Sequence, residues 1–187
     1  MKIAIIGGIG SGKSAVVHTI SGLGYIVCDC DAIYKEICTT KEYIDKIDKY
    51  FDVVKDGIID KKTLSEIVFS DKEKLALLNS IAHPLVFDRV DKLSQNSKDN
   101  IFIEVSAFDM SMKDRFDKII FVDCSHNKRV ERILERNPSL NKDMIEKIMS
   151  SQLDIEKMKS ISDYVIVNDG DMEELRKKVK AMLKDIK

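Results

Sequence analysis

Five short apolar runs along the chain have the pattern of buried β-strands. They are nearly continuous in Ile, Val and other apolar residues, and apolar positions do not alternate with polar ones. This pattern is typical of a parallel sheet covered by helices on both faces. The predicted strands are Ile3–Ile6, Tyr25–Cys28, Ile101–Val105, Lys118–Val122 and Tyr164–Val167.

Helical periodicity fills most of the segments between these runs. Apolar residues recur there at spacings of three and four, which places them on one face of a helix. Because strands alternate with helices, the pattern favours an α/β fold with three layers and a five-stranded parallel sheet. The predicted helices are Lys13–Ser21, Asn127–Arg136, Lys142–Met158 and Met172–Lys184.

The segment between the second and third predicted strands is too long for one crossover. Its apolar spacing is helical, as in "LALLNSIAHPLVFDRV". We therefore predict two domains: a core made of residues 1–30 and 97–187, and a helical insertion at residues 31–96.

Composition narrows the class of protein. The chain has 187 residues and a net charge of -1, so we expect no nucleic-acid partner. No apolar run approaches the ~20 residues of a membrane span, and we expect a cytoplasmic protein without a membrane partner. Four scattered cysteines indicate free thiols in a reducing compartment. The pair Cys28 and Cys30 is read as small buried side chains, with a metal or redox role as the less favoured alternative.

A glycine-rich motif follows the first predicted strand. The residues Gly7 to Ser14, "GGIGSGKS", match G-x-x-x-x-G-K-[ST] between a strand and a helix. Glycines let the backbone aim its N–H groups at phosphate oxygens, and the helix adds its positive N-terminal end. Lys13 can bridge the β- and γ-phosphates, and Ser14 can bind Mg²⁺. We predict that a nucleoside triphosphate is held by Gly8, Ile9, Gly10, Ser11, Gly12, Lys13, Ser14 and Ala15.

Two further patterns bear on what this phosphate does. GTPases usually carry N-K-x-D, but "NKRV" at 127–130 and "NKDM" at 141–144 lack the final Asp, which argues against a GTPase. Asp29 and Asp31 follow the second strand, at the sheet edge that carries the phosphate loop. One carboxylate could accept a hydroxyl proton and the other could position Mg²⁺ through water. The alternative is that one of them caps a helix.

Segments in every part of the chain resemble one family when they are taken in order. They are "GGIGSGKS", "GYIVCDCDAI", "KDGIIDKKTLSEIVFSDKEKLALLNSIAHPLV", "RVERILERN" and "SDYVIVNDG". Together they resemble the dephospho-coenzyme A kinases. The resemblance implies a P-loop NTPase fold with an acceptor-binding insertion and a small lid at about 132–150. It also implies transfer of the ATP γ-phosphoryl group to the ribose 3′-hydroxyl of dephospho-coenzyme A, the last step of coenzyme A synthesis.

The resemblance also implies roles for single residues. Asp31 would be catalytic, orienting the 3′-hydroxyl and accepting its proton, while Lys13 would neutralise charge on the transferred group. The predicted Mg²⁺ roles of Ser14 and Asp29 come instead from the glycine-rich motif and from the strand end described above. Arg136, together with Arg132, would reach phosphates, and Asn168 would lie near the adenine. Lys61, where the family usually has Arg, and His83 would contact the acceptor.

The residues alone also allow other interpretations of the two arginines, of His83 and of Asn168. The two arginines could pair with Glu131 or Glu135 on a helix surface. His83-Pro84 could start a helix, and Asn168 could form a turn before Asp169-Gly170.

Alternatives also remain for the whole protein. It could be another kinase of this architecture, acting on a nucleotide or nucleoside, or a nucleotide-binding regulator without catalysis. We expect a monomer or a weak homo-oligomer.

Overall fold

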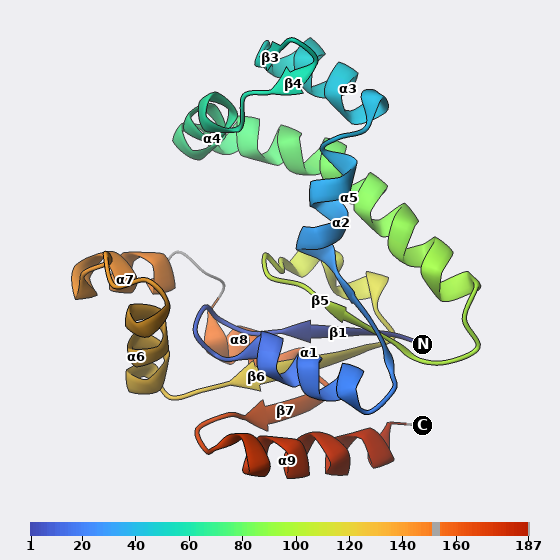
Figure 1. Cartoon of the computed structure of the whole chain (residues 1–187), viewed down its shortest axis with the longest axis vertical. Helices are drawn as coiled ribbons and strands as arrows, with labels where there is room; N and C mark the ends of the chain where they lie inside the picture. The colour runs from blue at the N-terminus through green and yellow to red at the C-terminus, as the bar shows by residue number, and fades with distance from the viewer. Residues whose placement is uncertain (151–153, 187) are drawn as a thin grey trace. The chain divides into compact units, whose positions relative to one another are not determined.

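A computed structural model describes residues 1–150 and 154–186, and its contacts divide the chain into two compact units (Figure 1). Unit 1 is formed by Met1–Asp29 and Ser97–Lys187, and unit 2 by Cys30–Asn96. The sequence predicts the domain boundaries between residues 30 and 31 and between residues 96 and 97. The acceptor role of the insertion and the lid at about 132–150 stay predictions.

Unit 1 is built on a five-stranded sheet. Its strands are β2 (Ile26–Asp29), β5 (Ile101–Glu104), β1 (Lys2–Ile6), β6 (Lys118–Asp123) and β7 (Tyr164–Val167), in that spatial order. All four pairings are parallel, which confirms the predicted sheet. The three central strands are almost fully buried, whereas the edge strands β2 and β7 are partly exposed.

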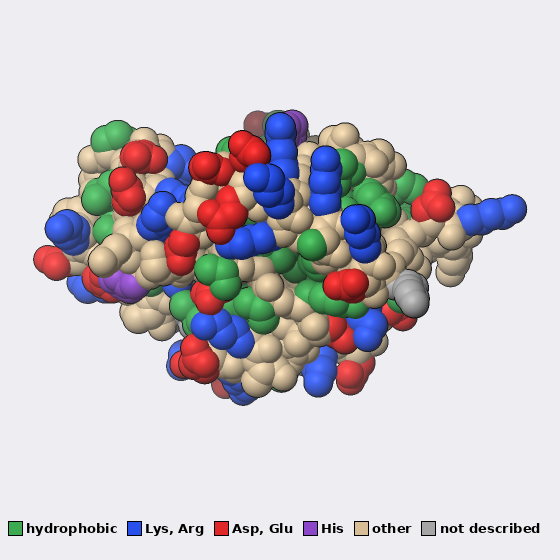
Figure 2. Space-filling model, turned by 90° about the horizontal axis from the view of Figure 1, so that it is seen from below, with side chains coloured by type: hydrophobic (Ala, Val, Ile, Leu, Met, Phe, Trp, Pro, Cys, Tyr) green, Lys and Arg blue, Asp and Glu red, His purple; other side chains and the backbone are tan. Residues whose placement is uncertain are grey.

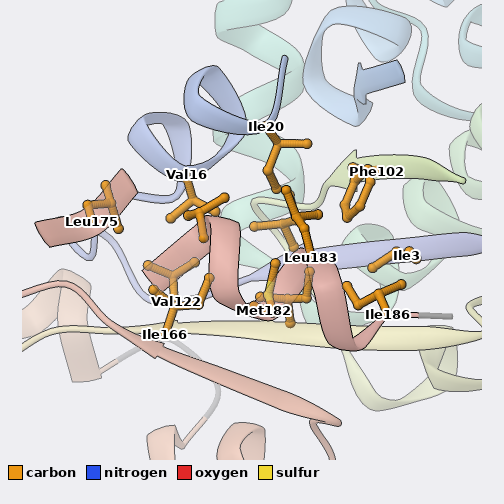
Figure 3. Close-up of a cluster of buried hydrophobic side chains, with 13 residues drawn as sticks. Ile3, Val16, Ile20, Phe102, Val122, Ile166, Leu175, Met182, Leu183 and Ile186 are labelled. Atoms are coloured by element: carbon orange, nitrogen blue, oxygen red, sulfur yellow. The ribbon is translucent and has the colours of Figure 1, made fainter. Parts of the chain in front are cut away.

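Two helices cover one face of this sheet: α1 (Lys13–Gly22) and α9 (Met172–Asp185). Val16 and Ile20 of α1 meet Val179 and Met182 of α9 over Ile5 and its strand neighbours, in the core that Figure 3 shows. The alternate residues Ala4 and Ile6 of β1 are also fully buried, so the second face is covered as well. This is the three-layer arrangement predicted from the apolar runs.

Besides β6, the described residues of unit 1 between β5 and β7 form the 3₁₀ helix η1 (Met110–Arg115) and the α-helices α6 (His126–Arg136), α7 (Lys142–Ser150) and α8 (Ile155–Ser160). The predicted single helix Lys142–Met158 is wrong. Asp154 has non-helical backbone angles (φ -53°, ψ 130°), and its carboxylate accepts a hydrogen bond from the Lys157 N–H, so it caps a new helix. Part of the predicted span, 151–153, lies outside the described residues.

Unit 2 contains α2 (Cys30–Ile37), α3 (Lys41–Phe51), α4 (Lys61–Ser70) and α5 (Lys72–Gln95). A small antiparallel hairpin, β3 (Val54–Lys55) and β4 (Ile58–Ile59), lies between α3 and α4. Its turn, Asp56-Gly57, has positive φ at both positions, as hairpin turns of this length prefer. The reading of His83-Pro84 as a helix start is wrong, because Pro84 lies inside α5.

The face of the molecule seen from below Figure 1 carries acidic and basic side chains in close mixture (Figure 2). On α9, Lys177 pairs with Glu173 at 2.8 Å and Lys178 pairs with Glu174 at 2.6 Å. Helices in the described part of the chain are all too short or too polar to cross a membrane.

Candidate active site

The loop between β1 and α1 is the predicted phosphate-binding loop, and at one key position only glycine can supply its backbone conformation. Gly12 directly precedes α1 with φ 89° and ψ 29°, in the left-handed region. A Cβ atom on Gly12 would also overlap the side-chain amide of Asn168, which lies against the loop. The close approach and the positive φ therefore both require glycine here.

Lys13 and Ser14 begin α1 and project functional groups at the loop. The Lys13 Nζ donates to the Gly7 carbonyl at 2.7 Å. The Ser14 hydroxyl donates to Glu104 Oε1 at 3.1 Å. Both groups therefore lie at the carboxyl end of the central strands, where open α/β sheets bind ligands.

Glu104 is a carboxylate that the sequence analysis missed. It is the last residue of β5, it is 9% exposed, and in the sheet register it stands between Ile5 of β1 and Asp29 of β2. The signal was an acid closing the apolar run "IFIE" at the loop edge of the sheet. Ser14, Glu104 and Asp29 thus offer oxygen atoms of the kind that Mg²⁺ prefers.

Two arginines of α6 donate hydrogen bonds to backbone carbonyls of the loop. Arg129 is 3% exposed, and its Nε donates to the Ile9 carbonyl at 2.9 Å. Arg132 donates through Nη1 to the Ser11 carbonyl at 3.3 Å and through Nη2 to the Asn168 carbonyl at 3.0 Å. The structure thus directs Arg132 to the loop and not to Glu131 or Glu135.

Asn168 and Asp169 complete this side of the loop. The Asn168 side chain is 5% exposed and donates to the Ser11 carbonyl at 2.8 Å. Asp169 accepts from the Ser125 N–H at 2.9 Å and from the Cys124 thiol at 3.3 Å. The Ser125 hydrogen bond lowers the pKa of Asp169, while burial raises the pKa of the Cys124 thiol to about 11. The thiol is therefore neutral at pH 7.

The other predicted residues lie in different places. Arg136 is exposed at the last position of α6. Asp31 lies in the first turn of α2 and is exposed, and it belongs to unit 2. Cys28 and Cys30 are free thiols, and burial raises the pKa of Cys28 to about 11. The described residues include no group of three or more His, Cys, Asp or Glu side chains placed to hold a metal.

Unit 2 has a pocket of its own, of about 400 Å³. Asp31 and Lys61 both line it, together with Tyr34, Tyr43 and a mostly apolar wall from α4 and α5. The two tyrosine hydroxyls are 2.8 Å apart, and burial raises the pKa of Tyr34 to about 12. His83 is not among the lining residues; its ring packs edge-on against Phe87, with centroids 6.3 Å apart.

Comparison with known proteins assigns the family. A family model described as dephospho-CoA kinase matches residues 1–174. The chain belongs to the dephospho-CoA kinase family. A dephospho-CoA kinase of Fusobacterium nucleatum is 38% identical over 191 residues, covering 100% of this chain and 98% of the relative. One from Thermobifida fusca is 32% identical over 186 residues, covering 96% and 92%.

Solved structures agree on the fold of this kinase. A crystal structure of a Thermus thermophilus protein has a TM-score of 0.86 at 29% identity, covering 100% of this chain and 98% of that one. The dephospho-CoA kinase of Campylobacter jejuni has a TM-score of 0.74 at 24% identity, with the same coverage. A shikimate kinase of Aquifex aeolicus has a TM-score of 0.53 at 19% identity, covering 98% and 96%. The predicted P-loop NTPase fold is confirmed.

Arg129 is the second residue at the candidate site that sequence reasoning missed. It lies one helical turn before Arg132, at a spacing that places both residues on one face of α6. That spacing, and the polar sequence of α6, are compatible with a solvent-exposed charge. Only the structure shows that Arg129 is buried against the loop.

Proposed function

We propose that this member of the dephospho-CoA kinase family transfers the γ-phosphoryl group of ATP, in the presence of Mg²⁺, to the ribose 3′-hydroxyl of dephospho-coenzyme A. The observation that carries the proposal lies in the loop Gly7–Ser14, where one buried hydroxyl, that of Ser11, has no hydrogen-bond partner in the described structure. Ser11 is 1% exposed, and its hydroxyl oxygen makes no hydrogen bond in the described structure.

An unpaired buried hydroxyl is costly, and a bound anion would satisfy it. The start of α1 adds N–H groups and the positive end of a helix dipole to the same place. Lys13, at this helix start, would move from the Gly7 carbonyl to the β- and γ-phosphates. These features support a triphosphate in the loop.

The residues beside the loop fit Mg²⁺. This ion usually takes only one or two protein ligands and keeps waters and phosphate oxygens for the rest. The Ser14 hydroxyl would bind it directly, and Glu104 and Asp29 would hold its waters. When bound, the ion neutralises charge on the phosphates.

Unit 2 would bind the acceptor. The pocket of about 400 Å³ combines an apolar wall with three charged residues, Asp31, Lys35 and Lys61, which is the character of small-molecule sites. Asp31 would accept a hydrogen bond and then the proton from the 3′-hydroxyl. Lys61, on the same pocket, would meet an acceptor phosphate as a point charge.

The proposed reaction forms one bond and breaks one. The 3′-oxygen forms a bond to the γ-phosphorus as its proton passes to Asp31, and the bond from that phosphorus to the β–γ bridging oxygen breaks. ADP leaves with the electron pair of that bond. Lys13 and the loop N–H groups stabilise the charge that gathers on the phosphoryl oxygens.

An acceptor analogue tests the site of phosphorylation. With Mg²⁺ and ATP, 3′-deoxy dephospho-coenzyme A should give no ADP above background, whereas the 2′-deoxy analogue should still be phosphorylated. Phosphorus NMR of the natural product should show a new phosphate monoester on C3′. Turnover of the 3′-deoxy analogue would contradict the proposal.

We also propose a cytoplasmic location, where thiols remain reduced. All four cysteines of the chain are free.

A further inference from the structure

A buried arginine behind the phosphate loop is not explained by the chemistry above. Arg129 is 3% exposed, and its guanidinium lies against the loop backbone: a Cβ atom on Gly8 would stand 2.5 Å from its Nη2. Arginine is almost never fully buried unless partners compensate its charge, because burying that charge is costly. The loop carbonyl of Ile9 receives its Nε–H at 2.9 Å.

Peptide geometry connects this bond to phosphate binding. In a trans peptide the C=O of one residue and the N–H of the next lie in one plane and point in opposite directions. The described peptide bonds include no cis bond. Arg129 holds the Ile9 C=O toward α6, so the Gly10 N–H of the same peptide points away from α6.

The same arrangement recurs two residues later. The Ser11 carbonyl accepts from Arg132 at 3.3 Å and from Asn168 at 2.8 Å, and the Gly12 N–H belongs to that peptide. In the described structure, neither the Gly10 N–H nor the Gly12 N–H makes a hydrogen bond. The loop therefore presents two available donors, each fixed through the carbonyl on the opposite side of its peptide.

We propose that Arg129 is a positioning residue for nucleotide binding, which orients the Gly10 N–H toward a bound phosphate by holding the Ile9 carbonyl. Arg132 and Asn168 do the same for the Gly12 N–H. The inference rests on the proposed function, since it takes the loop as the triphosphate site. It differs from a catalytic role, because Arg129 contacts the loop and not the reacting atoms.

Two variants test it: Arg129→Gln removes the charge, and Arg129→Lys keeps the charge but loses the planar Nε–H. Calorimetry with Mg²⁺–ADP and with inorganic tripolyphosphate should show that both variants bind about tenfold to a hundredfold more weakly, the range for one lost charge-assisted hydrogen bond. The KM for ATP should rise, while the KM for dephospho-coenzyme A should stay unchanged. Arg176→Gln, at an exposed position of α9, is the matched control and should bind like the wild type.

A readout that a merely structural role would not move is the amide NMR spectrum. The Gly10 amide signal of the wild type should shift when tripolyphosphate is added. In the variants without ligand, the Gly10 signal should move more than the Gly12 signal. If Arg129→Gln fails to fold, the lysine variant and the wild-type titration still decide the matter.

Several results would overturn the inference. Wild-type affinity in Arg129→Lys would mean that charge alone suffices, and wild-type affinity in both variants would remove Arg129 from nucleotide binding. A Gly10 amide signal unmoved by tripolyphosphate would also overturn it. If the wild type itself fails to bind Mg²⁺–ADP, the proposed function fails first, so the two failures are distinguishable.

Discussion

Replacing Gly12 by alanine isolates the fit between the phosphate loop and Asn168. Gly12 has φ 89°, and its added Cβ would overlap the Asn168 amide. Gly24, just beyond the other end of α1, has nearly the same φ of 88° but faces open space. Gly24→Ala is therefore a matched control that carries the backbone strain without the collision.

The expected magnitudes follow from these two environments. An L-residue in the left-handed region costs about 1–2 kcal/mol, and the stiffer unfolded chain returns about 0.4–1 kcal/mol of this. Gly24→Ala should thus lower the free energy of unfolding by about 1 kcal/mol. Gly12→Ala must in addition displace the buried Asn168–Ser11 hydrogen bond of 2.8 Å, which costs about 1–3 kcal/mol more.

Urea unfolding of five proteins measures this: the wild type, Gly12→Ala, Gly24→Ala, Asn168→Ala, and the double variant Gly12→Ala/Asn168→Ala. With the Asn168 side chain gone, Gly12→Ala should cost about as much as Gly24→Ala. Calorimetry should show weaker Mg²⁺–ADP binding for Gly12→Ala and wild-type binding for Gly24→Ala. Equal destabilisation by Gly12→Ala and Gly24→Ala in the wild-type background would refute the reasoning.

Three further predictions follow from the same structure. Asp31→Asn should leave ADP affinity unchanged but lower kcat by about 10²–10⁴, as expected for loss of a general base; near-normal turnover would remove Asp31 from the mechanism. Glu104→Gln should weaken ADP binding in the presence of Mg²⁺ and leave Mg²⁺-free binding unchanged. Calorimetry with and without the ion measures this, and an equal loss of affinity in both conditions would contradict the prediction. The Asp60 cap of α4 accepts from the Thr63 N–H, which lowers the pKa of this carboxyl to about 2 from 3.8. Its contribution to stability is complete above pH 3.8 and is lost as pH falls through about 2, so urea midpoints of Asp60→Asn should depend less on pH there, and parallel profiles would count against this role.

The sheet was predictable because burial on both faces leaves a strong signal in sequence. β1, β5 and β6 are nearly fully buried, and their predicted bounds differ from the observed ones by one residue at most. The helices α1 and α9 were equally clear, since each has one apolar face on the sheet. Local patterns suffice where burial is continuous.

Other elements depend on turn and capping residues, which the periodicity of apolar positions does not reveal. The Asp56-Gly57 turn is a strong hairpin signal, but two-residue strands leave almost no alternation to accompany it. Asp154 caps α8 in the middle of a run that reads as one helix. Proline favours the first turn of a helix, but the tertiary context of α5 overrides that preference, and Pro84 lies inside the helix.

The candidate site was predictable only where a motif records it. Lys13 and Ser14 follow from the glycine-rich pattern, and their place at the start of α1 follows from the strand before it. Glu104 and Arg129 act through neighbours that lie 90 and 120 positions away in the chain, at Ser14 and Ile9. No local pattern contains such contacts, so only the fold brings them together.

The central claim is the identity of the phosphoryl acceptor, and one assay tests it most directly. ADP release with Mg²⁺ and ATP should be measured side by side with dephospho-coenzyme A, AMP, dTMP, adenosine and no acceptor. The account predicts ADP production that depends on dephospho-coenzyme A, with coenzyme A confirmed by mass. ADP production with another acceptor alone, or none with any acceptor despite ATP binding, would contradict it.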